Sequence, residues 1–344
     1  RVKHNLRQIA YEKERNATRY EDRHSFELCR QEIVSGQHLG WLKHISYIYY
    51  SKYSDVDDKL TPVQRCEDIL GAENVTDAIS GLLAILNRSD LPTIDELNCA
   101  LLKREYYGWW YAVLAGSDEL FKKHPDVTQW NEGLLTKLLT LDVILALFTK
   151  DNNVVSDYSL PWKRDVILNK TAFFIKTYYH IINFCISNQL QHIRALNYLL
   201  NDTCIPIDYT VPLVMRLAKE HPDDVLHLQN LVEWLLAHPE SHAELLQLSE
   251  LMVAQPSKLK NPSYQIWLVC TYLFVPNQCQ DLFLSESKSA PEMIALIRQL
   301  SGKAKRRRGS SEQRLSLTQL EAIITVSATH FPNADRVARN DSNS

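Results

Sequence analysis

Hydrophobic residues recur along this chain at the three- and four-residue spacing of one face of an α-helix. One such apolar stripe, within residues 75–87, consists of Ala78, Leu82, Ile85 and Leu86. No alternation of apolar and polar residues persists long enough to mark a β-strand, and the chain has nine glycines and no Asn-Gly or Asp-Gly hairpin turn. The pattern therefore predicts an all-α fold.

Helix boundaries are also marked in the sequence. Residues 61–64 (Thr-Pro-Val-Gln) have the order of a capping box with proline at the first helical position, and Gly71 closes that segment. A second capping box at residues 93–96 (Thr-Ile-Asp-Glu) opens a helix that the apolar pattern continues towards Leu114. We expect Gly116 to end this second helix.

A short junction of His-Pro-Asp or His-Pro-Glu occurs three times, beginning at His124, His221 and His238. In each, the histidine suits the negative end of a helix dipole, the proline blocks continuation, and the acid can cap the next helix. Such junctions are typical of helical hairpins. We therefore expect an irregular array of antiparallel helical hairpins, either a degenerate α-solenoid or a helical bundle.

A polar loop at residues 151–160 is the best candidate for a domain boundary. It divides the sequence into an N-terminal helical region (1–150) and a C-terminal helical-hairpin region (151–335), and a polar tail (336–344) follows. The chain begins with Arg1 and without a targeting peptide, so we expect further domains of the same longer polypeptide to flank it.

Composition and charge restrict the partners and the compartment. Hydrophobic residues make up 45% of the 344, and the net charge is −3, so no global attraction to nucleic acid or anionic lipid is expected. The longest apolar run, residues 134–148, contains Lys137 and Asp142 and is too short for a membrane span. Seven scattered cysteines without a Cys-x-x-Cys pair indicate free thiols in a reducing compartment. The sequence thus predicts a cytoplasmic protein without a membrane segment.

Motifs for common catalytic chemistry are missing from the sequence. It contains no glycine-rich phosphate-binding loop, nucleophile elbow, His-Glu-x-x-His helix or EF-hand loop. The nearest histidine pair, His238 and His242, falls on two successive helices and does not share a face. We therefore expect no catalytic residues, no cofactor and no metal site.

One alternative catalytic interpretation remains open at this stage. Arg-x-x-x-x-His occurs twice, from Arg19 to His24 and from Arg216 to His221, and the spacing resembles that of the all-helical HEPN-type ribonucleases. Arg19 and His24 are the better candidates, since His221 is already expected at a helix end. That resemblance implies a guanidinium that holds the phosphate and an imidazole that acts on the ribose hydroxyl.

Aromatic residues form two dense groups. The first follows Trp41 and comprises Tyr47, Tyr49, Tyr50 and Tyr53; the second comprises Tyr106, Tyr107, Trp109, Trp110 and Tyr111. Five rings on one helix would surround it, so some must be exposed or packed against more than one neighbour. Tyr and Trp are favoured interface anchors because they bury a large area at small entropic cost. The second group is the predicted protein-binding site, with helix packing inside the scaffold as the alternative.

A basic run carries the only feature that could attract nucleic acid. It comprises Lys303, Lys305, Arg306, Arg307 and Arg308. No aromatic residue interleaves with it, so single-strand binding by base stacking is not expected. Nucleic-acid binding through this loop is a weaker alternative than protein binding.

A stretch in the N-terminal half resembles a known family. Residues 62–71 (Pro-Val-Gln-Arg-Cys-Glu-Asp-Ile-Leu-Gly), the apolar helix 78–86 and residues 89–97 (Ser-Asp-Leu-Pro-Thr-Ile-Asp-Glu-Leu) are similar to the helical region that follows the NTPase core in large bacterial NACHT/STAND proteins. The resemblance covers about residues 60–115. It implies a sensor or scaffold arm, in antiviral defence, that binds a foreign protein while a separate domain hydrolyses ATP.

Overall fold

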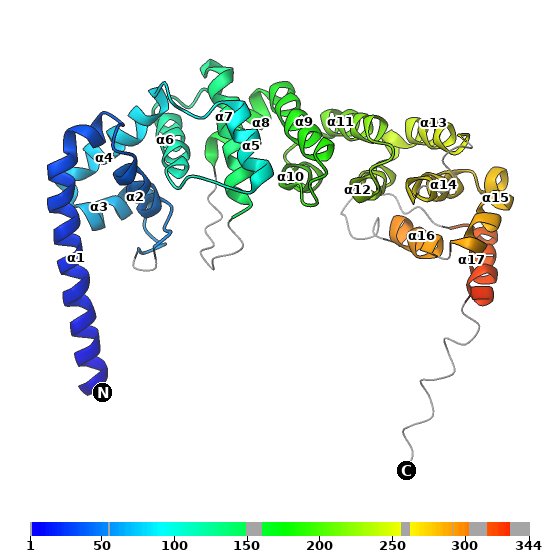
Figure 1. Cartoon of the computed structure of the whole chain (residues 1–344), viewed down its shortest axis with the longest axis horizontal. Coiled ribbons are helices and arrows are strands. Elements are labelled where there is room, and N and C mark those ends of the chain that lie inside the picture. The colour runs from blue at the N-terminus through cyan, green and yellow to red at the C-terminus, as the bar shows by residue number, and fades with distance from the viewer. Residues whose placement is uncertain are drawn as a thin grey trace, which may run out of the picture. The chain divides into compact units, whose positions relative to one another are not determined.

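The structure is a computed structural model that describes residues 2–53, 56–148, 160–255, 262–290, 292–302 and 315–330. Within these ranges the secondary structure consists of seventeen α-helices and three short 3-10 helices, without a strand (Figure 1). The predicted all-α fold is confirmed. The chain forms two compact units, Arg1–Ile205 and Pro206–Ser344. Across the described ranges, no helix is both long enough and apolar enough to cross a bilayer.

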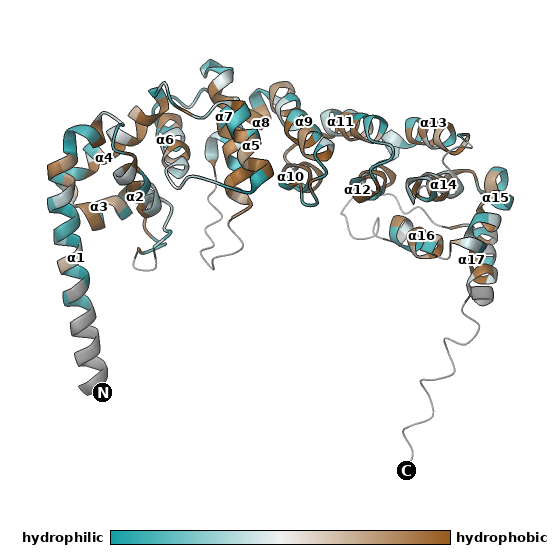
Figure 2. Cartoon of the chain, viewed as in Figure 1, coloured by the Kyte–Doolittle hydropathy of each residue, from teal (hydrophilic) through white to brown (hydrophobic). Residues whose placement is uncertain are grey.

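The first unit contains ten of the α-helices. They are α1 (Val2–Val34), α2 (Leu39–Tyr49), α3 (Pro62–Leu70), α4 (Ala72–Ala84), α5 (Ile94–Lys103), α6 (Trp110–Lys123), α7 (Glu132–Ala146), α8 (Pro161–Asn169), α9 (Thr171–Ser187) and α10 (Arg194–Asn201). Its short helices are η1 (Ile85–Asn87) and η2 (Val127–Gln129). Figure 2 shows that much of the described part of α1 is hydrophilic, whereas α7 carries hydrophobic residues over much of its surface.

Both predicted capping boxes are present in the first unit. The Thr61 hydroxyl accepts a hydrogen bond from the Gln64 backbone and starts α3, and the Thr93 hydroxyl does the same for Glu96 at the start of α5. The Gln64 and Glu96 side chains accept in return from the two threonine backbones. Each box satisfies backbone N–H groups that a helix start leaves unpaired.

The helix expected from Thr93 to Gly116 is in fact two helices. α5 ends at Lys103, and its C-cap residue Arg104 has a φ of 52° and a ψ of 49°, in the left-handed region; α6 begins only at Trp110. Gly116 does not end a helix; it lies in the middle of α6, where a side chain would overlap the backbone carbonyl of Leu82 on α4. The glycine is thus needed for the close approach of two helices rather than for a helix end.

The core of the first unit has α4 and α6 at its centre. α4 packs on α1, α3 and α6, and α6 packs in addition on α2 and α7. Their facing residues are fully buried, including Leu82 on α4 and Leu114 on α6. Burying one such side chain stabilises the folded unit by roughly 1.5–3 kcal/mol relative to leaving it exposed.

The predicted domain boundary lies in a segment outside the described residues, and helices on both sides of that segment belong to the first unit. The Lys163 ammonium of α8 lies 2.6 Å from an Asp142 carboxylate oxygen of α7, and both side chains are buried. The rings of Trp130 and Trp162 also lie close together, with centroids 6.4 Å apart. These contacts join the two sides, and the units divide instead between Ile205 and Pro206.

The second unit contains seven α-helices and one short helix. They are α11 (Ile207–Glu220), α12 (Val225–Leu236), η3 (Pro239–Ser241), α13 (His242–Val253), α14 (Pro262–Phe274), α15 (Pro276–Ser289), α16 (Glu292–Gly302) and α17 (Leu317–His330). Consecutive helices pack on each other at α11–α12, α13–α14 and α14–α15. The predicted helix ends are present: His221 follows the last residue of α11, and His238 separates α12 from η3. The predicted caps differ, because Asp224 rather than Asp223 caps α12 and Glu240 lies within η3.

Candidate functional site

The two aromatic groups of the sequence meet in the core of the first unit. Tyr111 of α6 is buried. Its ring centroid lies 5.6 Å from that of Tyr47 on α2 and 6.4 Å from that of Tyr50, which follows the last residue of α2. Tyr106 lies between Tyr111 and Phe148, with centroid distances of 6.1 Å and 4.5 Å. Two of the five predicted anchors, Tyr106 and Tyr111, therefore take part in packing within the scaffold.

An ammonium group is held against this aromatic core. The Lys52 nitrogen lies 3.9 Å from the centroid of the Tyr111 ring and 6.0 Å from that of Tyr47, within the range of a cation–π contact. Burial lowers the pKa of Lys52 to about 8 because it disfavours the charged form. Rings of α2 and α6 thus contact an ammonium group within the first unit.

Buried polar groups fix α6 against α2. The Tyr50 hydroxyl donates to Asp118 over 2.9 Å, and the Tyr49 hydroxyl donates to Glu119 over 2.7 Å. Lys122 forms an ion pair with the same Glu119 carboxylate. Burial raises the pKa of Asp118 to about 7, and the Tyr50 hydrogen bond opposes that rise. These contacts determine where the first residues of α6 point.

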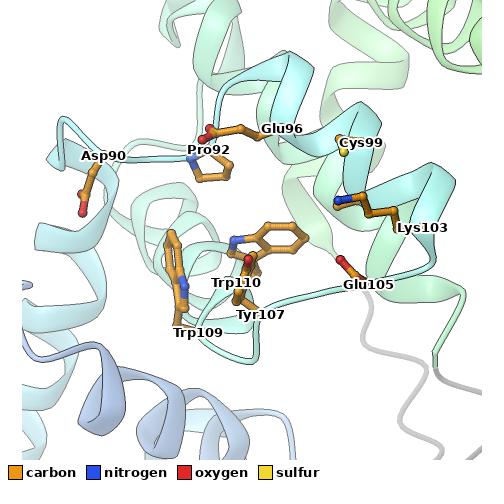
Figure 3. A pocket seen from close by; sticks show the side chains of 10 residues that line it. Asp90, Pro92, Glu96, Cys99, Lys103, Glu105, Tyr107, Trp109 and Trp110 are labelled. Carbon is orange, nitrogen blue, oxygen red and sulfur yellow. The ribbon is translucent and has the colours of Figure 1, made fainter.

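On the outer side of the same segment is a pocket of about 340 Å³, which we call the aromatic pocket (Figure 3). It is lined by Asp90, Pro92, Glu96, Cys99, Ala100, Lys103, Glu105, Tyr107, Trp109 and Trp110. One wall is a face of α5, since Glu96, Cys99, Ala100 and Lys103 follow helical spacing. The other wall consists of the three rings at and before the start of α6. The volume is within the range of pockets that bind ligands.

The three rings meet at steep angles. The plane of Trp110 makes an angle of 72° with that of Tyr107, at a centroid distance of 5.3 Å, and of 77° with that of Trp109, at 6.4 Å. Tyr107 is 64% exposed, whereas Trp110 is 2% exposed. The Trp110 indole nitrogen is buried and has no hydrogen-bond acceptor among the described residues. A buried donor without an acceptor costs about 1–3 kcal/mol.

Local sequence explains how the segment between α5 and α6 is shaped. Arg104 in the left-handed conformation turns the chain out of α5, which is a common way for a helix to end. Gly108 then lies so close to α2 that a Cβ atom would come within 2.7 Å of the Lys43 side chain and 2.9 Å of the Tyr47 hydroxyl. With the chain held close to α2, Tyr106 and Tyr111 lie on the inner side, whereas Tyr107 and Trp109 lie on the outer side.

Four charged side chains line the aromatic pocket. Asp90, Glu96 and Glu105 supply carboxylates, and Lys103 supplies one ammonium. The Asp90 carboxylate is already paired with Arg88 at 2.6 Å, and one Glu96 oxygen accepts from Thr93. The Arg88 hydrogen bond lowers the pKa of Asp90, and the Thr93 backbone lowers that of Glu96, so both stay ionised. The rim is therefore acidic on balance.

Sequence reasoning identified the aromatic wall of this pocket but not the α5 wall. Glu96, Cys99 and Lys103 are exposed residues on one face of α5, and their spacing of three and four residues was a readable signal. What the sequence did not show is that the chain reverses after Arg104 and sets the rings opposite that face.

The alternative catalytic pair does not converge in the structure. The Nη1 and Nη2 atoms of Arg19 donate to the Asp68 carboxylate, at 3.0 Å and 2.5 Å, whereas His24 is exposed. The two residues lie five positions apart on α1, which separates their side chains by about 140° around the helix. The Arg19 charge is thus already compensated by α3.

Two further expectations concern nucleic acid and metals. The basic run from Lys303 to Arg308 lies outside the described residues. In the described ranges, no three His, Cys, Asp or Glu side chains come together in a way that could hold a metal ion. The seven cysteines are free thiols, and Cys66, Cys185, Cys270 and Cys279 are buried.

Comparison of the chain with models of protein families, with curated proteins and with solved structures finds no match. The aromatic pocket is therefore interpreted from its own geometry and chemistry.

Proposed function

We propose that this chain is a protein-binding helical scaffold whose first unit holds an extended segment of a partner protein in the aromatic pocket. The observation that carries the proposal is the pocket itself, in which an exposed Tyr107, a half-buried Trp109 and a buried Trp110 face a helix. Tyrosine and tryptophan are enriched among the few residues that carry most of the binding energy of protein interfaces, and these residues cluster where a pocket is filled.

The support for a binding role comes from how firmly the rings are placed. Trp110 starts α6, which Gly116 holds close to α4 and which Asp118 and Glu119 fasten to α2. Rings that are fixed before binding lose little conformational freedom when a ligand arrives, so more of their contact energy appears as affinity. The firmly placed Trp110 and the exposed Tyr107 together suit a peptide segment as the ligand.

The proposal is tested by selecting binders from an unbiased library of displayed peptides on the full chain. The selected peptides should lose at least tenfold in affinity with Trp109→Ala and with Tyr107→Ala, since each truncation removes an anchor ring worth about 1.4 kcal/mol or more. Tyr20→Ala serves as the matched control because Tyr20 is a 74% exposed tyrosine on α1, away from the pocket. Fluorescence anisotropy measures the affinities, and circular dichroism checks the fold.

Two results of this selection would count against the role. One is that no peptide is enriched above background. The other is that enriched peptides bind the Trp109→Ala and Tyr107→Ala variants as tightly as they bind the wild type.

We further propose that the binding role is that of a sensor arm in a larger cytoplasmic NTPase of antiviral defence, as the resemblance of residues 60–115 implies. In support, the lining of the aromatic pocket, from Asp90 to Trp110, falls inside that stretch. The sequence encoded immediately upstream of Arg1 tests this context. A phosphate-binding loop of a nucleotide hydrolase is expected there. Its absence would overturn the NTPase context, and the peptide-binding role would remain.

The proposed role is non-catalytic, and a direct assay tests this part. Purified full chain incubated with labelled RNA in the absence of metal should leave the RNA intact. Cleavage that disappears in His24→Ala would overturn the non-catalytic role in favour of a helical ribonuclease.

A further inference from the structure

We propose that the segment received by the aromatic pocket is basic: an arginine or lysine side chain lies across the exposed rings while its ammonium or guanidinium group meets the carboxylates of α5 and of the following loop. This proposal rests on the peptide-binding function proposed above and adds the chemistry of the ligand. It is carried by the charge of the lining, the orientation of the rings and the unpaired indole of Trp110.

The charge of the lining favours a cation. Three carboxylates and one ammonium line the pocket, and Asp90 is balanced by Arg88 outside it. The charges left for a ligand are those of Glu105 and of the Glu96 oxygen that Thr93 does not use, opposed by Lys103. In Figure 3, Glu96 and Glu105 lie on different sides of the pocket, so a basic segment that crosses it would pass a carboxylate on each side.

The orientation of the rings favours the same ligand. Trp109 and Tyr107 are each turned by more than 70° from the plane of Trp110, so the lining contains ring faces in at least two directions. The face of an aromatic ring attracts a cation, and rings at steep angles surround it. Elsewhere in the first unit, the Lys52 ammonium already lies 3.9 Å from the centroid of the Tyr111 ring of α6.

The buried indole supplies a donor for a peptide backbone. The Trp110 nitrogen has no acceptor among the described residues, and a main-chain carbonyl of an extended segment is a suitable one. The nitrogen has almost no exposed area, so a neighbouring side chain of the wall has to turn before a carbonyl oxygen reaches it. The α5 face from Glu96 to Lys103 spans about 10 Å at the helical rise of 1.5 Å per residue, which matches about three extended residues.

Three labelled, end-capped hexapeptides titrated against the full chain test the proposal, with fluorescence anisotropy as the readout. Their central pair is Arg-Arg, Glu-Glu or Pro-Pro in an otherwise identical Gly-Ser frame. The Arg-Arg peptide should bind, more weakly as salt is raised, and the Glu-Glu peptide should not. The Pro-Pro peptide stands for the competing preference of an aromatic groove for a polyproline segment.

Charge variants separate a specific site from a general field. Glu96→Gln combined with Glu105→Gln should weaken the Arg-Arg peptide about tenfold, because two carboxylate contacts are lost. Gln at position 96 retains the capping box that starts α5. Asp95→Asn is the matched control, since Asp95 is an exposed acid of the same helix that does not line the pocket. It should change the affinity less than twofold.

Removing the indole donor tests the backbone contact. Trp110→Phe keeps an aromatic ring and removes the N–H, so the Arg-Arg peptide should bind several-fold more weakly while the circular dichroism spectrum is unchanged. Unchanged affinity in this variant would remove the backbone contact from the proposal.

The outcomes distinguish this inference from the binding function beneath it. A Pro-Pro peptide that binds as tightly as Arg-Arg and ignores Glu96→Gln with Glu105→Gln would overturn the basic ligand and leave the peptide-binding function standing. Weakening by Asp95→Asn equal to that of the double variant would show attraction by general charge and would also overturn it. Failure of all three peptides, together with a library selection that yields binders independent of Trp109, would overturn both.

Discussion

Replacing Gly116 with alanine should destabilise the first unit, although alanine is the better helix former. Gly116 lies in the middle of α6 against α4, and an added Cβ would overlap the Leu82 carbonyl oxygen. It would also lie 3.0 Å from the Leu82 carbonyl carbon and 3.3 Å from a Leu86 side-chain carbon. Carbon atoms pack best at about 3.5–4.0 Å, and the overlap with the oxygen is larger than that with either carbon, so α4 and α6 would have to separate by about 1 Å or more.

The magnitude follows from two opposing terms. Forcing a methyl group into a well-packed contact costs about 1–3 kcal/mol, and the upper end applies here because the obstacle is backbone rather than a flexible side chain. The helix propensity of alanine returns about 1 kcal/mol relative to glycine. We therefore expect a net loss of about 2 kcal/mol in the free energy of unfolding, or a fall in Tm of roughly 4–8 °C for a unit of this size.

Gly40→Ala is the matched control, with the opposite expected sign. Gly40 is an exposed glycine in the first turn of α2, where a Cβ would contact only the His38 ring, at 3.4 Å and 3.6 Å. This variant should therefore gain roughly 0.5–1 kcal/mol.

Urea unfolding followed by tryptophan fluorescence measures both variants, since five of the seven tryptophans belong to the first unit. The slope with urea should match that of the wild type, which shows that the same surface is exposed on unfolding. A Gly116→Ala protein as stable as the wild type would refute the close packing of α4 on α6. Equal effects of the two substitutions would show that helix propensity alone decides.

Three further predictions concern buried polar groups and a helix cap. Burial raises the pKa of Asp118 from about 3.9 in the unfolded chain to about 7, so the stability that its protonated form contributes is present below about pH 4 and lost as pH rises through 7. The free energy of unfolding of Asp118→Asn, relative to that of the wild type, should therefore increase between about pH 4 and 8, by at most about 4 kcal/mol. The same difference between the two proteins in urea unfolding at both pH values would contradict this. Lys163→Met should lower the free energy of unfolding by about 3–5 kcal/mol because it leaves the Asp142 charge buried and unpaired, whereas Lys163→Met combined with Asp142→Leu should lower it much less. Equal losses of stability in thermal unfolding of the two variants would argue against a buried pair. Thr61→Ala should lower the free energy of unfolding by about 1 kcal/mol because it removes the capping box of α3, and Thr61→Asn, whose side chain can cap, should retain most of that stability. Identical melting of the two variants would show that the cap contributes nothing.

Helix starts and junctions were readable from the sequence because they depend on a few neighbouring residues. The hydroxyls of Thr61 and Thr93 reach backbone groups three positions away, and the histidines before Pro222 and Pro239 mark helix ends for equally local reasons. Local chemistry therefore fixed the all-α class and two capped helices.

Features that depend on contacts distant in sequence could not be predicted in the same way. Gly116 reads as a helix end by composition, but its role comes from Leu82, which is far away along the chain. The apolar pattern continues through residues 104–109, so it does not reveal that the chain turns after Arg104. Lys163 and Asp142 likewise pair across a long segment.

The aromatic pocket shows the same division. The sequence by itself determined that tyrosine and tryptophan would gather at residues 106–111, and it determined the charges of Glu96 and Lys103 on one face of a helix. Only the tertiary structure decided which rings face inwards and which line the pocket, because that choice depends on α2 packing beside Gly108. Residue types fix the chemistry available to a chain, whereas contacts between its distant segments fix which of those groups remain open to a partner.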